Sequence, residues 1–242
     1  MGPRGKPRAR WGRRLLLVLF FAAATWVAWE LATWPDVGRL ATERPASTAF
    51  IDHYRARQRA HGKPDRIAWT WVPYAAISAD LKRAVLVSED INFFSHRGFD
   101  LGEVQNALEK AVREGEAPRG ASTITQQLAK NLWLSGTRSP YRKVKEAILT
   151  CQLERALSKR RILELYLNVA EFGPGVFGAG AAGQRYFGRP AAELGPAEAA
   201  ALAAGLPMPG TWHPGVDTAA YRRRVAAIQI RMDKAAFLAR QI

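Results

Sequence analysis

The sequence contains a single cysteine, Cys151, among its 242 residues. One cysteine cannot form an intramolecular disulfide, and a cysteine-rich metal site is excluded as well. We expect this residue to pack as a small apolar side chain. Acidic residues are also few, because 21 aspartates and glutamates stand against 36 lysines and arginines, for a formal net charge of +15. This excess suits partners that carry phosphate, whether nucleic acid, anionic lipid or a diphosphate substrate.

Several motifs that would favour other classes of protein are missing. The sequence has no zinc-ligand spacing, RNP aromatic motif or helix-turn-helix pattern, so nucleic acid is not the favoured partner. Strong strand alternation and internal repeats are absent. The glycine-rich run at 173–188 lacks the Walker spacing, and its interleaved aromatic residues favour close helix packing or a tight turn over a flexible linker. The remaining segments have helical periodicity, which predicts a mainly α protein.

One long apolar run is present at residues 15–34, and its length suits a helix that spans a bilayer. The basic tail that precedes it, residues 1–14, predicts a cytoplasmic N-terminus and a body outside the membrane. A cleaved signal peptide is the alternative, but the run is long for such a peptide and no convincing small-x-small cleavage site follows. We therefore expect a retained transmembrane anchor, a membrane-proximal connector at 35–60 and one globular domain at 61–242.

A carboxylate pair, Glu89 and Asp90, lies in the otherwise apolar and aromatic segment VLVSEDINFFSHRGFD. Ser78 can cap a helix whose apolar positions continue at helical spacing toward Glu89. Glu89 would then lie in the last turn, where the negative end of the helix dipole suits a general base. An isolated Glu-Asp pair is more often a solvated helix end, so the functional interpretation depends on the rest of the pattern.

A second polar segment, GASTITQQLAKN, begins at residue 120. Ser122 or Thr123 can cap its helix, and Gln126 and Lys130 lie four residues apart, so that they can address one ligand together. A second acid, Glu146, follows within a basic group made up of Arg138, Arg142, Lys143 and Lys145. Glycosyl transfer from a diphosphate needs a base for the acceptor hydroxyl and cations for the leaving group, and this pattern supplies both. From charge alone, a solvated helix face is equally compatible.

The order of the motifs favours one family. The segments are EDINFFSHRGFD, GASTITQQLAKN, RKVKEAILTCQLE, ILELYLNVAEFGPGVFGAGAAGQRYFG and an alanine-rich helix that ends in LPMP. In this order, over residues 65–215, the chain resembles the peptidoglycan glycosyltransferases, which also form the N-terminal half of bifunctional penicillin-binding proteins. The absence of a Ser-x-x-Lys motif with its partner motifs favours a monofunctional member. Ala121 departs from the pattern, because the family has a second glycine there.

The resemblance implies a mainly α, lysozyme-like fold with two lobes across a cleft. It also implies lipid II, a disaccharide-pentapeptide on undecaprenyl diphosphate, as the substrate of an inverting transfer that builds β-1,4 glycan strands. On matching positions, Glu89 would be the general base for the acceptor hydroxyl, and Glu146 would hold cations or assist at the leaving group. Lys130 and Arg138 would bind the diphosphate. The remaining substrate-binding residues would be Asp90, Ser122, Thr123, Gln126 and Gln127, whereas His96 would pack or form hydrogen bonds.

The resemblance implies no required cofactor, although a divalent cation, Mg²⁺ or Mn²⁺, can act at a diphosphate. Its partners would be lipid II, the growing glycan strand and membrane lipid, with other cell-wall synthases open and nucleic acid excluded. The protein would lie in the bacterial inner membrane with a periplasmic catalytic domain. A lysozyme-like lytic transglycosylase is one alternative, but it would have no need of Lys130 and Arg138. A non-catalytic wall scaffold is the other, and it would tolerate the loss of Glu89.

Overall fold

The structure is a computed structural model that describes residues 8–115, 120–134, 136 and 139–242. It divides into two compact units, Met1–Asp36 and Val37–Ile242. The first unit contains α1 (Arg8–Ala32), which is long and apolar enough to cross a membrane and has no buried side chain in its apolar stretch. A helix that is apolar on every side and has no protein packed around it suits a bilayer.

The second unit is mainly helical, as predicted. Its elements are η1 (Val37–Ala41), α2 (Ala49–Ala60), β1 (Ala68–Trp69), η2 (Tyr74–Ala76), α3 (Ala79–Glu89), α4 (Leu101–Glu114), α5 (Ile124–Trp133), α6 (Pro140–Ala156), α7 (Lys159–Val169), β2 (Glu171–Gly173), β3 (Val176–Phe177), α8 (Gly178–Phe187), η3 (Ala191–Glu193), α9 (Pro196–Gly205), α10 (Ala219–Lys234) and η4 (Ala236–Arg240).

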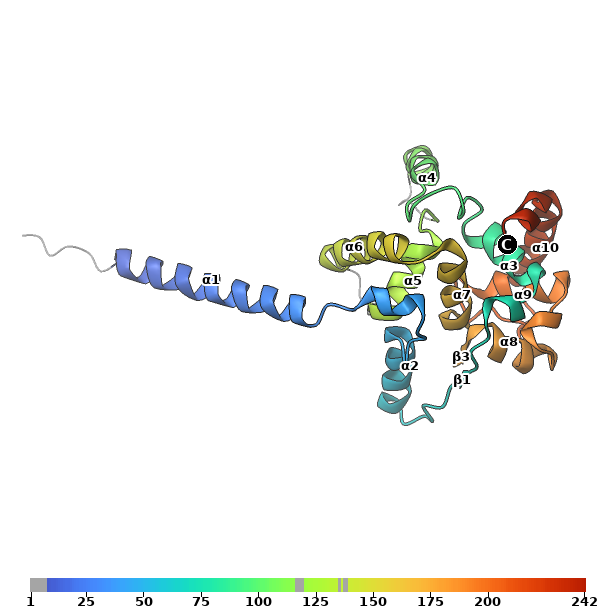
Figure 1. Ribbon diagram of the computed structural model, residues 1–242, viewed down its shortest axis with the longest axis horizontal. Coiled ribbons are helices and arrows are strands. Elements are labelled where there is room, and N and C mark those ends of the chain that lie inside the picture. The colour runs from blue at the N-terminus through green and yellow to red at the C-terminus, as the bar shows by residue number, and fades with distance from the viewer. Residues whose placement is uncertain (1–7, 116–119, 135, 137–138) are drawn as a thin grey trace, which may run out of the picture. The chain divides into compact units, whose positions relative to one another are not determined.

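Two groups of helices form the core of this unit. α3 packs against α9 and α10, whereas α5 packs against α6 and α7 (Figure 1). The Ser78 hydroxyl accepts a hydrogen bond from the Leu81 N–H at 3.0 Å, so α3 begins where the sequence predicts. Leu81 and Val85 are fully buried and Glu89 is the last helical residue. The predicted position of Glu89 at the end of a helix is therefore confirmed.

A small sheet lies between the helices, in the strand order β1-β3-β2. β1 runs parallel to β3, and β2 runs antiparallel to it. Gly178, which follows β3, has a φ of +79°, and a Cβ there would lie 2.6 Å from the carbonyl oxygen of Asn168. A residue other than glycine would meet both backbone strain and a clash. This position agrees with the prediction that the glycine-rich run permits close packing.

The segment predicted as a connector, residues 35–60, holds η1 and α2. α2 packs against α5, and its Ile51 is fully buried. Arg161 of α7 donates hydrogen bonds to the carbonyl oxygens of Leu40 (2.8 Å) and Glu43 (2.6 Å). These contacts join the segment that begins at Val37 to α7.

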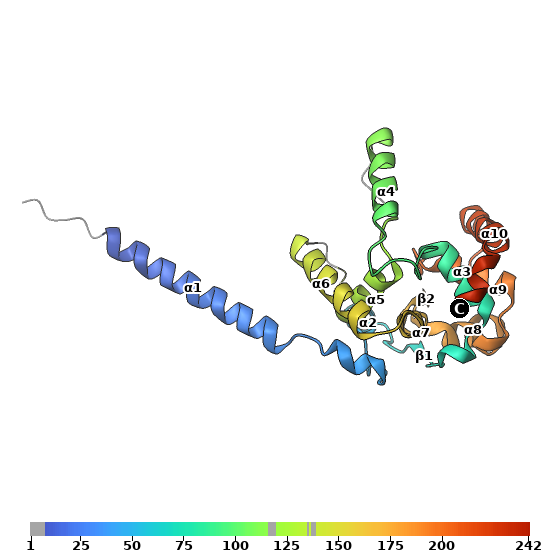
Figure 2. The ribbon, with the colours of Figure 1, turned by 45° about the horizontal axis from the view of Figure 1, so that its top comes forward.

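α4 projects from the rest of the second unit (Figure 2), and none of its side chains is buried. Its apolar residues follow the predicted helical spacing, yet Leu108 and Val112 are exposed. On α6, Cys151 is also exposed. The expectation that Cys151 packs as a small apolar residue was wrong, because the buried side chains of α6 are those at 146, 149, 150 and 153.

Candidate active site

Glu89 lies in the wall of a cavity of about 460 Å³, together with Ser88, Asp90, Ser122 and Thr123. Its side chain is 10% exposed. The Ser88 hydroxyl donates to Oε1 at 2.8 Å, and the Gln127 side-chain amide donates to Oε2 at 3.0 Å. Because each oxygen has a donor, the carboxylate is held in one orientation beside a space of the size that ligand pockets have.

Arg224 of α10 is a further contact of Glu89 that the sequence analysis missed. Its Nη2 lies 3.3 Å from Glu89 Oε1 and 3.1 Å from the Ser88 hydroxyl. The two charged residues are 135 positions apart in the sequence. α10 reaches Glu89 because it packs on both α3 and α9. No local pattern points to Arg224, since its neighbours Arg222 and Arg223 have the same charge.

Gln127 is held from both sides. Its Nε2 donates to Glu89, while its Oε1 accepts a hydrogen bond of 2.8 Å from the Tyr166 hydroxyl. Tyr166 lies on α7 and is 1% exposed. Burial is the largest cause that raises the pKa of Tyr166 well above 10.0, and the charges of Glu89 and Asp90 act in the same direction. The phenol therefore stays protonated and can act as a donor.

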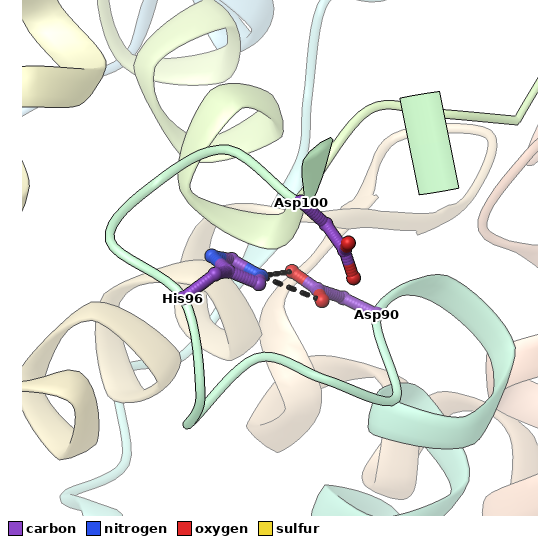
Figure 3. A group of neighbouring side chains, drawn as sticks. All are labelled: Asp90, His96 and Asp100. Atoms are coloured by element: carbon purple, nitrogen blue, oxygen red, sulfur yellow. Dashed lines mark hydrogen bonds and ion pairs between the residues drawn. The ribbon is translucent and has the colours of Figure 1, made fainter. Parts of the chain in front are cut away.

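Asp90 connects the loop after α3 to the start of α5. One of its oxygens lies 2.9 Å from His96 Nε2 (Figure 3). The other accepts a 2.9 Å hydrogen bond from the Ile124 N–H. His96 Nδ1 accepts from the Gly98 N–H at 3.2 Å, so this arrangement uses the tautomer with its proton on Nε2. These contacts support a hydrogen-bonding role for His96. They occupy Asp90, whose predicted role in substrate binding stays a prediction.

Asp90, His96 and Asp100 offer ligand atoms within 4.8 Å of one another, but they do not fit a metal ion as they stand. Figure 3 shows the imidazole directed at Asp90 with Asp100 beside the pair. Asp100 accepts hydrogen bonds from Asn92 Nδ2 (2.9 Å) and the Glu103 N–H (3.0 Å). These two donors lower the pKa of Asp100. An ion would have to replace contacts that already satisfy all three residues, so we assign no metal here.

We expect Asp90→Ala to lower the free energy of unfolding by about 2–4 kcal/mol, because it removes the partner of a buried imidazole and of a helical N–H. Thermal unfolding of the full chain in detergent measures this. Asp65→Ala is the control, since it removes only a surface ion pair with Arg59. An unfolding midpoint like that of the control would contradict a structural role for Asp90.

Thr123 and Gln126 cap α5, and Thr123 is the N-cap residue rather than Ser122. The Thr123 hydroxyl accepts from the Gln126 N–H, while Gln126 Oε1 accepts from the Thr123 N–H at 3.0 Å. The Thr123 hydroxyl also donates to the carbonyl oxygen of Gly98 at 2.7 Å. Both side chains are buried, whereas Ser122 is exposed in the wall of the cavity. Ser122 is therefore the more accessible of the residues predicted to bind substrate here.

Lys130 of α5 is partly buried near the basic residues of α6. Burial is the largest cause that lowers its pKa from 10.5; the charges of Glu146 and Glu89 raise it, and Arg142 and Lys143 lower it further. Lys130 Nζ also lies 5.5 Å from the centre of the Phe50 ring. The site thus keeps an ammonium group where its hydration is reduced, which increases its attraction for an anion.

Glu146 is 3% exposed and lies among cations. It accepts a 3.1 Å hydrogen bond from Arg142 Nη1 and forms an ion pair with Lys143. This geometry supports the predicted role of Glu146 in holding cations. Arg138, the other predicted diphosphate ligand, lies outside the described residues. Neither Lys130 nor Glu146 lines the cavity beside Glu89, so the described cations of α5 and α6 form a separate part of the site.

Comparisons with known proteins agree on one family. The family model described as Transglycosylase matches residues 58–233. A biosynthetic peptidoglycan transglycosylase from Azoarcus sp. (strain BH72) is 51% identical over 201 residues, which cover 83% of this chain and 85% of that protein. A protein with the same description from Laribacter hongkongensis (strain HLHK9) is 41% identical over 222 residues, which cover 92% of this chain and 95% of that protein.

Proposed function

Because this chain belongs to the Transglycosylase family, we propose that it polymerises lipid II into β-1,4 glycan strands and releases undecaprenyl diphosphate. One observation carries the proposal: Glu89 is held by donors in the wall of a cavity, while the partly buried cation Lys130 lies within electrostatic reach of it. A base and an anion site next to each other suit transfer of a glycosyl group from a diphosphate.

In the proposed reaction, Glu89 takes the proton from the 4-hydroxyl of the GlcNAc at the end of the acceptor. The hydroxyl oxygen forms a bond to C1 of the donor MurNAc as the bond from C1 to the phosphate oxygen breaks. The electron pair of the broken bond leaves with the diphosphate, and attack from the opposite face inverts α to β. Glu89 holds the proton until it passes to solvent.

Lys130 would balance the charge that develops on the leaving diphosphate. An ammonium group with reduced hydration stabilises a developing anion more than one in water does. Arg142 and Lys143 act electrostatically on Lys130 and pair with Glu146, which would set their positions. Arg138 remains part of the proposal on the strength of its position in the motif.

A divalent cation is an optional part of the proposal. Mg²⁺ usually binds through phosphate oxygens, water and one or two carboxylates. Glu146 lies among the α6 cations, but its oxygens already pair with Arg142 and Lys143. We therefore propose that protein cations stabilise the leaving group and that Mg²⁺ or Mn²⁺ is accessory.

The site and the anchor together suit a substrate that is itself bound to a membrane. We propose that α1 spans the inner membrane, with the basic N-terminus in the cytoplasm and the catalytic unit in the periplasm. Undecaprenyl diphosphate would then be released into the same bilayer. The growing glycan strand and membrane lipid are the proposed partners, other cell-wall synthases remain open, and nucleic acid has no place in the proposal.

The test is polymerisation of labelled lipid II by the purified full chain in detergent, with and without EDTA. Long glycan products that persist in EDTA would support both the polymerase and its protein cations. Release of fragments from isolated sacculi, with no product from lipid II, would favour the lytic alternative. Binding to sacculi with neither activity would favour a scaffold.

Arg224 should help to hold Glu89 in position for catalysis, because its Nη2 contacts both Glu89 Oε1 at 3.3 Å and the Ser88 hydroxyl at 3.1 Å. We expect Arg224→Gln to lower kcat/KM roughly tenfold, because a charge-assisted contact that orients the carboxylate is lost. Arg224→Lys should restore part of the loss. Arg223→Gln removes an exposed charge from the same helix and is the matched control. A kcat/KM in Arg224→Gln equal to that of Arg223→Gln would count against this role.

A further inference from the structure

The orientation of the Gln127 side chain matters to Glu89. An amide has an oxygen that accepts and a nitrogen that donates, and the carboxylate of Glu89 needs the nitrogen. Rotation of the amide by half a turn would place its oxygen against Glu89 Oε2 instead. In the structure the nitrogen lies 3.0 Å from Glu89, and the amide oxygen lies 2.8 Å from the Tyr166 hydroxyl.

The Tyr166 hydroxyl supplies a physical reason for this orientation. When the protonated phenol donates to the amide oxygen of Gln127, the amide nitrogen is left facing Glu89. In this orientation both the oxygen and the nitrogen of the amide form a hydrogen bond. The rotated amide would lose the bond to Glu89 and bring together two acceptors. Because burial strongly favours the protonated phenol, the Tyr166 hydroxyl remains a donor across the pH range in which the enzyme works.

Packing alone does not require a hydroxyl at this position. Tyr166 is among the largest fully buried side chains of the core, and a phenylalanine would fill nearly the same volume. Burial of a hydroxyl costs free energy unless it finds a partner, and the partner here is Gln127. Tyr166 is absent from the lining of the cavity beside Glu89, so its effect on the reaction would pass through Gln127.

We propose that Tyr166 is a positioning residue for the general base, because its hydroxyl holds the Gln127 amide with its nitrogen directed at Glu89. The proposal rests on the proposed role of Glu89 in lipid II polymerisation. Tyr166 acts from the core of α7 and Gln127 from α5, so two separate helices determine how the carboxylate at the end of α3 is presented.

The central test is a double-mutant cycle on the full chain in detergent, with labelled lipid II as the substrate. Tyr166→Phe removes the hydroxyl, and Gln127→Met removes the amide while keeping a side chain of similar length. We expect Tyr166→Phe to lower kcat roughly threefold to tenfold with little change in KM, because one hydrogen bond is lost away from the substrate. In the Gln127→Met background, Tyr166→Phe should have no further effect on kcat.

Tyr221→Phe is the matched control. The Tyr221 hydroxyl is also buried and donates a 2.8 Å hydrogen bond, to the carbonyl oxygen of Ala201. We expect this variant to lose stability to a similar extent but to keep its kcat. A Tyr166→Phe variant with the kcat of wild type would overturn the proposal. The proposal would also be overturned if Tyr166→Phe lowered kcat as much in the Gln127→Met background as in wild type, or if Tyr221→Phe lowered kcat as much as Tyr166→Phe does. Either result would indicate a general effect on the fold.

A measurement on the wild-type chain covers the case in which Tyr166→Phe does not fold. The side-chain amide protons of Gln127, observed by ¹⁵N NMR in micelles, should exchange with solvent much more slowly than those of exposed Gln105. Equal exchange rates would overturn the proposal, because the amide would not be held. Failure of the proposed function itself is distinguishable, since wild type would then be inactive or Glu89→Gln would be active.

Discussion

Glu89→Gln is expected to remove lipid II polymerisation almost completely while the chain stays folded. Glutamine has nearly the same shape as glutamate but cannot accept the proton of the acceptor hydroxyl, so the loss should be on the order of 10²–10⁴-fold in kcat. The fold should tolerate the change, because Glu89 is the last residue of α3 and the apolar side chains that anchor this helix precede it.

The measurement is the rate of glycan formation from labelled lipid II, accompanied by a thermal melt of each variant. Glu193→Gln is the control, since it removes one exposed carboxylate from η3, away from the site. Normal product from Glu89→Gln would remove Glu89 from its role as the base and direct attention to Glu146. A much lower melting temperature in Glu89→Gln, or the absence of a cooperative unfolding transition, would instead assign Glu89 a structural role.

Lys130→Met is the second change with a large expected effect. It should lower activity without lowering stability. Loss of a cation that faces a developing anion should lower kcat on the order of 10²–10³-fold, as the loss of a single stabilising donor does in other active sites. Methionine keeps an unbranched apolar stem in the same space. Its control is Lys110→Met on α4, an exposed lysine that pairs weakly with Glu114.

The stability of Lys130→Met should equal or exceed that of wild type at neutral pH. Burial lowers the pKa of Lys130 in the folded chain, so the charged form costs folding free energy below that pKa. This cost fades as pH rises through the folded pKa toward 10.5, the value in an unfolded chain. The melting temperature of wild type should therefore rise relative to that of Lys130→Met between pH 7 and pH 10. A difference that does not change with pH would contradict a buried charge at Lys130.

Local signals in the sequence were sufficient for several parts of this site. Ser78 and the apolar spacing after it place the end of α3 at Glu89, since a side-chain cap and helical periodicity act within a few residues. Thr123 was one of the caps predicted for α5, and Gln126 completes the capping box. Lys130 follows one turn after Gln126 on the same helix. The order of the motifs identified the family before any geometry was known.

Other parts of the site could not be predicted, because they depend on which helices meet. Arg224 looks like any other charge on α10 until that helix packs on α3. The partners of Asp90 are also decided by the fold, since it accepts the first N–H of α5 and a hydrogen bond from His96. The apolar spacing of α4 predicted the helix but not that Leu108 and Val112 would remain exposed.

The sequence by itself determined the apolar N-terminal helix, the helical class, the family and the end of α3 at which Glu89 lies. These features depend on composition, periodicity and capping, which operate between residues close together in the chain. Tertiary structure decided which donors from other helices reach Glu89, because Gln127 comes from α5 and Arg224 from α10, while Tyr166 of α7 holds Gln127. A hydrogen bond acts only within about 3 Å, and packing of the core brings these distant residues within that range.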